Sequence, residues 1–185
     1  MLEYIHQLDT TSIYAIQSIG PSWYGVAWLL SAIIGASVIL VPTTAITLFL
    51  IGKKRVAIET LAVFLLSVLA VYVLKALIVA ARPFSVDALV IQYAEELTSG
   101  MPSGHALISL AVLGWVWFRH PKSVILSTGI PALILFIGLS RVYLGVHYPS
   151  QVIAGWVVGG LLLWIFWWLE RFLFRPRSSY VRRGK

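Results

Sequence analysis

Three short clusters of cationic, hydroxyl and imidazole side chains interrupt an otherwise apolar sequence. The first contains Lys75 and Arg82, followed by Pro83. The second is Met-Pro-Ser-Gly-His at residues 101–105, and the third lies at residues 140–151. Lysine and arginine bind phosphate oxygens, and an imidazole can act as a nucleophile or carry a proton. Together the clusters predict chemistry on a phosphate group.

In the first cluster, Lys75 and Arg82 are separated by about two helical turns, so a continuous helix would place both on one face. Pro83 would end that helix. Two cations reaching to a membrane interface are the simpler alternative. Lys75, however, lies far enough inside an apolar run to need an anionic partner or a water-filled pocket, because a charge there costs roughly 2.5 kcal/mol or more.

The second cluster has the composition of a helix start. Pro102 and Ser103 suit the first positions of a helix, where free backbone N–H groups favour a phosphate. Gly104 would let that phosphate approach the backbone, and His105 would lie beside it. The alternative is an ordinary capped helix with an incidental histidine.

The third cluster begins with Ser140 and Arg141 and reaches His147 and Gln151. Arginine offers a planar fork for two phosphate oxygens, and the histidine offers a nucleophile or proton carrier. Three cations, two histidines and a helix start would thus meet on one membrane face. Independent interfacial charges would produce this set only by coincidence.

The elements that position these clusters are membrane helices. Of 185 residues, 59% are hydrophobic and 11% are charged, and the charges avoid several long apolar stretches. A span needs about 20 apolar residues. We predict an all-α bundle of about five spans, at residues 24–51, 56–81, 103–118, 124–140 and 149–173. Pro42 could kink the first span.

The ends of the chain carry different signals. Residues 8–20 are too polar to span but have isoleucines at helical spacing, which predicts an interfacial helix within residues 1–22. Nothing there resembles a signal peptide, so we expect this segment in the mature protein. Residues 174–185 form a basic tail. We predict one membrane-embedded domain, residues 1–185, without disulfides because cysteine is absent.

The distribution of positive charge predicts the orientation. Of 14 lysines and arginines, all but Lys75, Arg82 and Arg141 fall on one side of the predicted spans. The positive-inside rule makes that side cytoplasmic. The excess charge is therefore read as a topology signal and an attraction to anionic lipid, and a nucleic-acid partner is not expected. The three clusters then face the extracytoplasmic side of a cell membrane.

Together the clusters resemble the type 2 phosphatidic acid phosphatase superfamily, whose pattern is KxxxxxxRP, PSGH and SRxxxxxHxxxD. The resemblance implies a bundle of membrane helices that hydrolyses lipid phosphates through a phosphohistidine, without a metal or other cofactor. It implies that His147 is the nucleophile and His105 the general acid, then the base for water. The residues implied to hold the phosphate are Lys75, Arg82, Ser103, Gly104 and Arg141.

The sequence departs from this pattern at Gln151, which stands where the family has an aspartate. An amide oxygen can still accept the ring N–H of His147, but it brings no negative charge. Activity could be lower, or Asp87, Glu95 or Glu96 from the loop before the second cluster could fold over the site. The alternative for these acids is a solvated loop.

The resemblance favours undecaprenyl diphosphate as substrate, since small members of the superfamily often hydrolyse it. Phosphatidylglycerophosphate, phosphatidic acid and lipid A phosphates remain alternatives, because nothing in the sequence indicates which lipid tail the protein binds. A phosphotransferase is a second hypothesis. A lipid-phosphate binding protein that has lost turnover through Gln151 is a third. The partners expected are the lipid substrate and the bilayer, and the sequence leaves the oligomeric state open.

Overall fold

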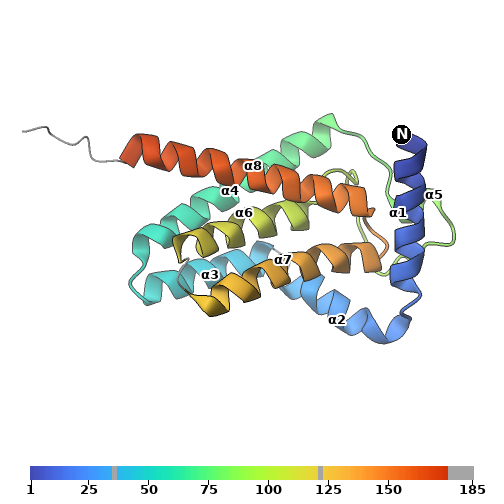
Figure 1. Ribbon diagram of the computed structural model, residues 1–185, viewed down its shortest axis with the longest axis horizontal. Helices are drawn as coiled ribbons and strands as arrows, with labels where there is room; N and C mark the ends of the chain where they lie inside the picture. The colour runs from blue at the N-terminus through green and yellow to red at the C-terminus, as the bar shows by residue number, and fades with distance from the viewer. Residues whose placement is uncertain (35–36, 121–122, 175–185) are drawn as a thin grey trace, which may run out of the picture.

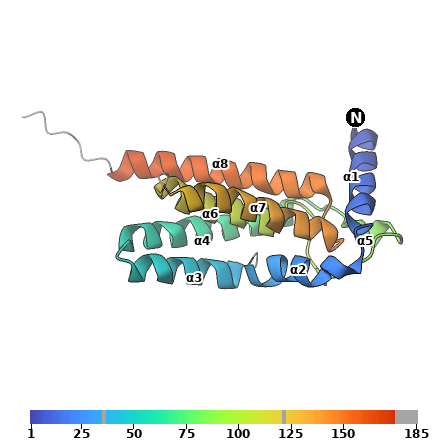
Figure 2. The same cartoon turned by 60° about the horizontal axis from the view of Figure 1, so that its bottom comes forward.

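The computed structural model describes residues 1–34, 37–120 and 123–174, and this part of the chain contains helices and no strands. The predicted all-α fold is confirmed. In Figures 1 and 2 the long helices run side by side, and α1 crosses one end of the bundle. The elements are α1 (Leu2–Gln17), the 3-10 helix η1 (Pro21–Trp23), α2 (Tyr24–Trp28), the π-helical η2 (Leu29–Ile34), α3 (Ser37–Leu50), α4 (Lys54–Leu77), α5 (Pro83–Val86), α6 (Gly104–Arg119), α7 (Val124–Tyr143) and α8 (Pro149–Phe174).

The helices correspond closely to the predicted spans. Among the described residues, three helical segments are long and apolar enough to cross a membrane: Lys54–Leu77, Val124–Tyr143 and Pro149–Phe172. Ile39–Leu50 and Gly104–Arg119 are shorter apolar helices. The first predicted span is divided into α2, η2 and α3, which lie almost in line in Figure 2. Its irregular part is η2, whereas α3 continues through Pro42.

The second predicted span is too long at its C-terminal end. Helix α4 ends at Leu77, and Ile78 is extended at φ −110° and ψ 103°. Arg82 is extended as well, because the ring of Pro83 disfavours the α conformation of the preceding residue. The prediction that Lys75 and Arg82 share one helical face is therefore wrong. Arg82 instead follows a short extended segment, in which the carbonyl of Ala80 accepts a 2.9 Å hydrogen bond from Gly100 N–H.

Helix α6 is buried against α8 through two glycines of α8. A Cβ atom on Gly155 would lie 2.6 Å from the carbonyl oxygen of Ser103, and one on Gly159 would lie 2.5 Å from that of Leu107. The two glycines are one helical turn apart, so together they let the backbones of α6 and α8 approach closely. This contact places the start of α6, with its histidine, beside the start of α8.

The N-terminal helix α1 lies across the end of the bundle, as Figure 2 shows, and contacts α7 and α8. Its Ile13 is fully buried, whereas Ile19 lies beyond the helix and is 57% exposed. Asp9 is also buried, and its two carboxylate oxygens accept hydrogen bonds from Ser150 N–H (2.9 Å) and Ser150 Oγ–H (2.5 Å). These hydrogen bonds hold α1, within the segment predicted to be interfacial, to the first turn of α8.

Basic residues gather at the opposite end of the bundle. Arg55 forms ion pairs with Glu59 (2.7 Å) and Glu170 (2.5 Å), and Arg119 pairs with Glu59 (3.3 Å). These contacts join the ends of α4, α6 and α8. Lys122 and the predicted basic tail after Phe174 lie outside the described residues.

Candidate active site

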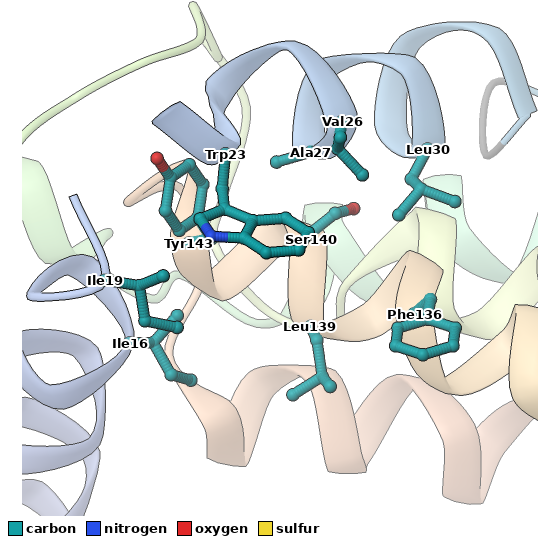
Figure 3. Close-up of a pocket in the computed structure, with 10 residues that line it drawn as sticks. All are labelled: Ile16, Ile19, Trp23, Val26, Ala27, Leu30, Phe136, Leu139, Ser140 and Tyr143. Atoms are coloured by element: carbon teal, nitrogen blue, oxygen red, sulfur yellow. The ribbon is translucent and has the colours of Figure 1, made fainter. Parts of the chain in front are cut away.

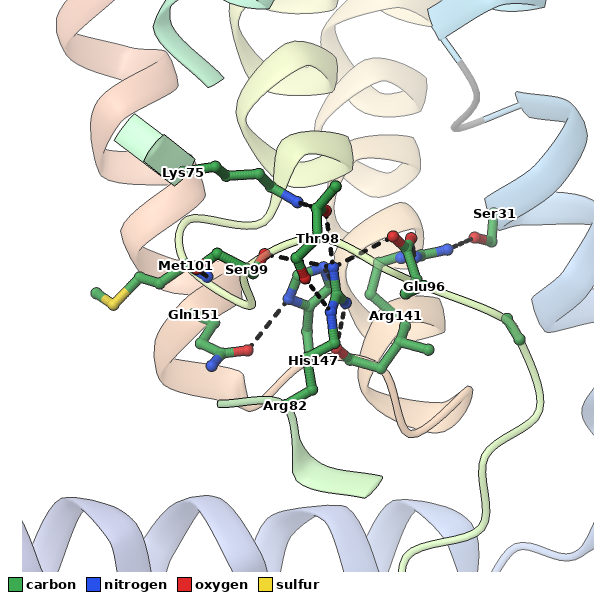
Figure 4. A network of polar contacts seen from close by, with 12 residues as sticks. Ser31, Lys75, Arg82, Glu96, Thr98, Ser99, Met101, Arg141, His147 and Gln151 are labelled. Atoms are coloured by element: carbon green, nitrogen blue, oxygen red, sulfur yellow. Dashed lines mark hydrogen bonds and ion pairs between the residues drawn. The ribbon is translucent and has the colours of Figure 1, made fainter. Parts of the chain in front are cut away.

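The three sequence clusters meet at the end of the bundle that α1 crosses (Figure 4). The last turn of α4 supplies Lys75, and the last turn of α7 supplies Arg141. Arg82 precedes α5, and His147 lies in the turn between α7 and α8. The remaining predicted residues are at the starts of α6 and α8: Ser103, Gly104, His105 and Gln151.

The side chain of Arg82 is held in place by backbone carbonyls. It is 4% exposed, and its Nε and Nη1 groups donate to the carbonyl oxygens of Thr98 and Val146, each at 2.8 Å. Its Nη1 also lies 3.4 Å from Nε2 of His147. The guanidinium therefore stands directly beside the imidazole, and its position does not depend on a ligand.

The contacts of Gln151 determine which ring nitrogen of His147 carries a proton. The Nε2 group of Gln151 donates to the carbonyl oxygen of Ala81 (2.9 Å), and its Oε1 accepts from Tyr148 N–H (3.2 Å). Oε1 therefore faces Nδ1 of His147 at 3.1 Å, and Nδ1 must be the donor. Nε2 of His147 is left unprotonated, with its lone pair toward Arg82.

Burial and nearby cations keep His147 neutral. The side chain is 1% exposed, and desolvation with the positive charges of Arg141 and Arg82 lowers the pKa of His147 well below its ordinary value. The hydrogen bond to Gln151 opposes this shift in pKa. The site thus contains a neutral imidazole whose Nε2 lone pair is available for attack on an electrophile.

A tight turn presents His147 to the other helices. Gly145 has a φ of 72°, which L-residues other than glycine rarely adopt, and a Cβ atom there would lie 2.2 Å from the carbonyl oxygen of Ile91. The backbone N–H groups of Val146 and His147 both donate to the carbonyl oxygen of Arg141, each at 3.3 Å. The turn therefore keeps the arginine and the histidine of the third cluster together.

Glu96 occupies the space between the two buried arginines. Its Oε2 lies 3.2 Å from Nη2 of Arg82, and its Oε1 accepts from Nη2 of Arg141. The two carboxylate oxygens lie on two guanidinium groups, as two oxygens of a bound phosphate could. The sequence had indicated three acids that could fold over the site, and Glu96 does so. Asp87 instead accepts a 2.5 Å hydrogen bond from Tyr14 Oη.

Two hydroxyl side chains complete the network without any sequence motif to indicate them. Thr98 Oγ1 accepts from Lys75 Nζ at 2.8 Å and from Nη2 of Arg82 at 3.3 Å. Ser31 Oγ, in η2, accepts from Nη1 of Arg141. A threonine in a loop and a serine in an apolar helix are too common for their types to reveal such contacts.

The start of α6 contains a hydroxyl that its own helix does not use. Ser103 is the N-cap residue, yet its side chain forms no cap hydrogen bond, and its buried Oγ has no partner. The Nε group of Arg141 is buried without a partner as well. His105, one turn into α6, lies in the electrostatic field of Arg141, Lys75 and Arg82. These unsatisfied groups fit an additional oxygen ligand at the site.

No group of three or more histidine, cysteine, aspartate or glutamate side chains that could hold a metal ion occurs among the described residues. Polar groups near His147 are mainly nitrogen donors, which favour an anion. The carboxylate of Glu96 is already paired with two arginines. The donor set therefore suits a phosphate better than a divalent cation.

Comparison with known proteins gives similarities over much of the chain. A sequence model of the PAP2 superfamily matches residues 56–175. An undecaprenyl-diphosphatase of Sulfolobus acidocaldarius is 30% identical over 126 residues, which are 68% of this chain and 60% of that protein. Glucose-6-phosphatase 3 of Rattus norvegicus is 36% identical over 81 residues, but these are only 23% of its length. The matched part of the chain is thus shorter than two thirds of either relative.

The fold resembles that of a solved structure along almost its whole length. The PAP2-type phosphatidylglycerolphosphate phosphatase from Bacillus subtilis aligns with a TM-score of 0.77 and 26% identity, over 94% of this chain and 90% of that one. The shared fold therefore includes the helices that carry all three clusters.

Proposed function

The chain belongs to the PAP2 superfamily, and on that premise we propose that it is an integral membrane phosphatase that hydrolyses a lipid phosphate through His147. The observation that supports this most directly is the orientation of the imidazole. Its Nδ1–H faces Gln151, and its free Nε2 lies 3.4 Å from a guanidinium nitrogen of Arg82. A phosphate bound to Arg82 would meet the lone pair of Nε2.

The proposed reaction proceeds in two steps. Nε2 of His147 attacks phosphorus, the bond from phosphorus to the leaving oxygen breaks, and His105 donates a proton to that oxygen. The product is a phosphohistidine. In the second step His105 takes a proton from water, the water oxygen attacks phosphorus, and the bond from phosphorus to Nε2 breaks. Inorganic phosphate is released, and His147 returns to its neutral form.

The surrounding cations would stabilise the negative charge of the transferring phosphoryl group. Lys75, Arg82 and Arg141 supply three positive charges, and Ser103 Oγ–H and Gly104 N–H supply further donors. We propose that these groups make a metal unnecessary, because metal ions perform the same neutralisation in other phosphoryl-transfer enzymes. The unpartnered Ser103 Oγ supports its place in this set.

Glu96 must leave the arginines before a phosphate can bind. Its carboxylate contacts Arg82 and Arg141, where the phosphate oxygens would lie. Its position in the loop before α6 allows this exchange without moving a membrane helix. Glu96 therefore competes with substrate. It does not take the role of the family's aspartate, because Gln151 already accepts the hydrogen bond from Nδ1 of His147.

We propose undecaprenyl diphosphate as the substrate and a cell membrane as the location, with the site on the extracytoplasmic side. The undecaprenyl-diphosphatase relative and the charge distribution support these assignments. Phosphatidylglycerophosphate, phosphatidic acid and lipid A phosphates are the alternatives to be compared. The proposed unit is one membrane domain, with residues 1–22 at the interface and residues 174–185 as a cytoplasmic tail.

The decisive experiment measures phosphate release from undecaprenyl diphosphate by the purified protein in detergent, with EDTA present. We expect release by wild type, loss of release in His147→Ala, and acid-labile labelling of the wild type when the terminal phosphate carries ³²P. Phosphatidic acid, phosphatidylglycerophosphate and glucose 6-phosphate serve as comparison substrates. Binding without release from any of them would contradict the proposed hydrolase and favour a lipid-phosphate binding protein.

A further inference from the structure

An apolar groove lies between the N-terminal helices and α7, separate from the polar network. Its volume is about 390 Å³, and Figure 3 shows its two walls. Phe136 and Leu139 of α7 form one wall, and Val26 and Leu30 of α2 and η2 form part of the other. The two lining residues with hydroxyl groups both donate them to backbone carbonyl oxygens, Ser140 to Ile137 at 2.7 Å and Tyr143 to Gly20 at 2.6 Å. The lining therefore offers almost no hydrogen-bonding group to a ligand.

Both walls of the groove continue into the phosphate site. In η2, Leu30 lines the groove, and the next residue, Ser31, accepts a hydrogen bond from Arg141. In α7, Ser140 lines the groove, and the next residue is Arg141 itself. Only the hydrogen bond between Ser31 and Arg141 thus lies between the groove and the guanidinium of Arg141. A molecule with an anionic head and an apolar tail could occupy both.

The exposure of the lining residues shows where the groove is open. Tyr143 lines the groove at the end of α7, and its Oη–H donates to the carbonyl oxygen of Gly20 at 2.6 Å, which joins the two walls there. Phe136 and Leu139, nearer the middle of α7, are 53% and 39% exposed. The groove is therefore open along α7, a helix long and apolar enough to cross a membrane, as a path for a lipid tail requires.

From this geometry we infer that the groove between α2 and α7 binds the hydrocarbon tail of the lipid whose phosphate lies on Arg82 and Arg141. The inference rests on the proposed function and extends it to recognition of the tail. The groove keeps an alkyl or isoprenoid chain in contact with apolar side chains while the phosphate lies on the arginines, and an apolar lining accepts chains of many kinds. The groove distinguishes a lipid phosphate from a soluble one.

A second groove, of about 500 Å³, lies between α4 and α6. It contains Lys75, Thr98 and Ser99 among its lining residues, so one part of it is polar. Its other lining residues include Val68, Val71 and Ile108, so a hydrocarbon chain could also lie here. It provides the alternative location against which the inference is tested.

The experiment narrows each groove with tryptophan and compares a lipid substrate with a soluble one. Leu139→Trp and Val26→Trp narrow the α2–α7 groove from opposite walls, and Val68→Trp narrows the α4–α6 groove. Ile165→Trp, at a 44% exposed position of α8, is the control for adding a tryptophan. For each protein, kcat/KM is measured with undecaprenyl diphosphate and with p-nitrophenyl phosphate in the same detergent.

We expect the two α2–α7 variants to lose about tenfold or more of kcat/KM for the lipid, with little change for p-nitrophenyl phosphate. Lipid and soluble activities that fall together, or a selective loss confined to Val68→Trp, would overturn the inference. Failure of the proposed function gives a different pattern, because wild type would then hydrolyse neither substrate. That result would reject the tail site together with the phosphatase.

Discussion

At the scale of single residues, the contact of His147 with Gln151 determines which ring nitrogen of the proposed nucleophile is unprotonated. The glutamine is long enough to reach His147 with Oε1 while its Nε2 donates to the carbonyl oxygen of Ala81. Gly100 leaves space for this arrangement, because a Cβ atom there would lie 2.8 Å from both Gln151 Nε2 and the oxygen of Ala81. An aspartate is one methylene shorter and has no N–H to donate. Gln151 therefore belongs to a packed arrangement and is not a simple loss of charge.

A carboxylate at this position should change the pH dependence of the reaction. In Gln151→Glu the negative charge stabilises the imidazolium, so the pKa of His147 rises from its depressed value. Since the nucleophile must be neutral, the acid limb of kcat/KM against pH should move to higher pH. Gln92→Glu, on the exposed loop, adds the same charge away from the site and should leave the profile unchanged. An acid limb that stays in place or moves to lower pH would contradict the assigned role of Gln151.

Removing the charge of Glu96 should strengthen phosphate binding. In Glu96→Gln, Arg82 and Arg141 no longer hold an internal carboxylate, so the substrate has less to displace. We expect a severalfold lower KM and stronger inhibition by inorganic phosphate, where tenfold corresponds to about 1.4 kcal/mol. Glu95→Gln, on the adjacent exposed residue, is the matched control. An unchanged or higher KM in Glu96→Gln alone would mean that Glu96 orients the arginines and does not compete with substrate.

At the scale of elements, the contact between α6 and α8 sets the position of the proposed catalytic groups. Gly155 and Gly159 let α8 lie directly on the backbone of α6, whose first turn contains Ser103 and His105. The same end of α8 contains Gln151 and is held to α1 through Asp9. Both histidine-bearing segments therefore depend on two small residues well inside the bundle.

A methyl group in this contact should destabilise the bundle. In Gly159→Ala the new Cβ would lie 2.5 Å from the carbonyl oxygen of Leu107, so a backbone must shift, at a cost of about 1–3 kcal/mol. Gly129→Ala in α7 is the control, since nothing lies within 4 Å of its Cβ position. There the loss of backbone freedom in the unfolded chain should stabilise by about 0.5–1 kcal/mol. Thermal unfolding in detergent should give a lower Tm for the first variant only, with reduced turnover.

At the scale of the whole molecule, charge is divided between the two ends of the bundle. One end has the cations of the site, and the other has the ion pairs of Arg55 and Arg119 with Glu59 and Glu170. Retention of positive charge on the cytoplasmic side would orient the site outward. The site needs this orientation to bind the proposed substrate in the outer leaflet.

The absence of native cysteine allows this orientation to be measured directly. Leu89→Cys lies in the loop beside the site, where Leu89 is 76% exposed, and Ile51→Cys lies at the other end, where Ile51 is 62% exposed. A membrane-impermeant maleimide should label the first variant in intact cells and the second only after permeabilisation. The reverse pattern would place the site in the cytoplasm.

The sequence by itself determined the class of fold, the approximate spans and the residues that converge. Apolar length and residue type at helix ends are local properties, so Lys75, Arg141 and the start of α6 could be placed from the pattern alone. The spacing of Gly155 and Gly159 is typical of glycines at a close contact between helices. The spacing alone does not reveal which helix they contact.

Only the tertiary structure decided the contacts made between distant segments. Arg82 leaves the helical path because Pro83 follows it, and its new position depends on hydrogen bonds to residues of the loop before α6. The insertion of Glu96 between two arginines and the proton on Nδ1 of His147 depend on the same loop and on the carbonyl of Ala81. Such contacts arise from packing of segments with no regular spacing, so no periodic pattern in the sequence records them.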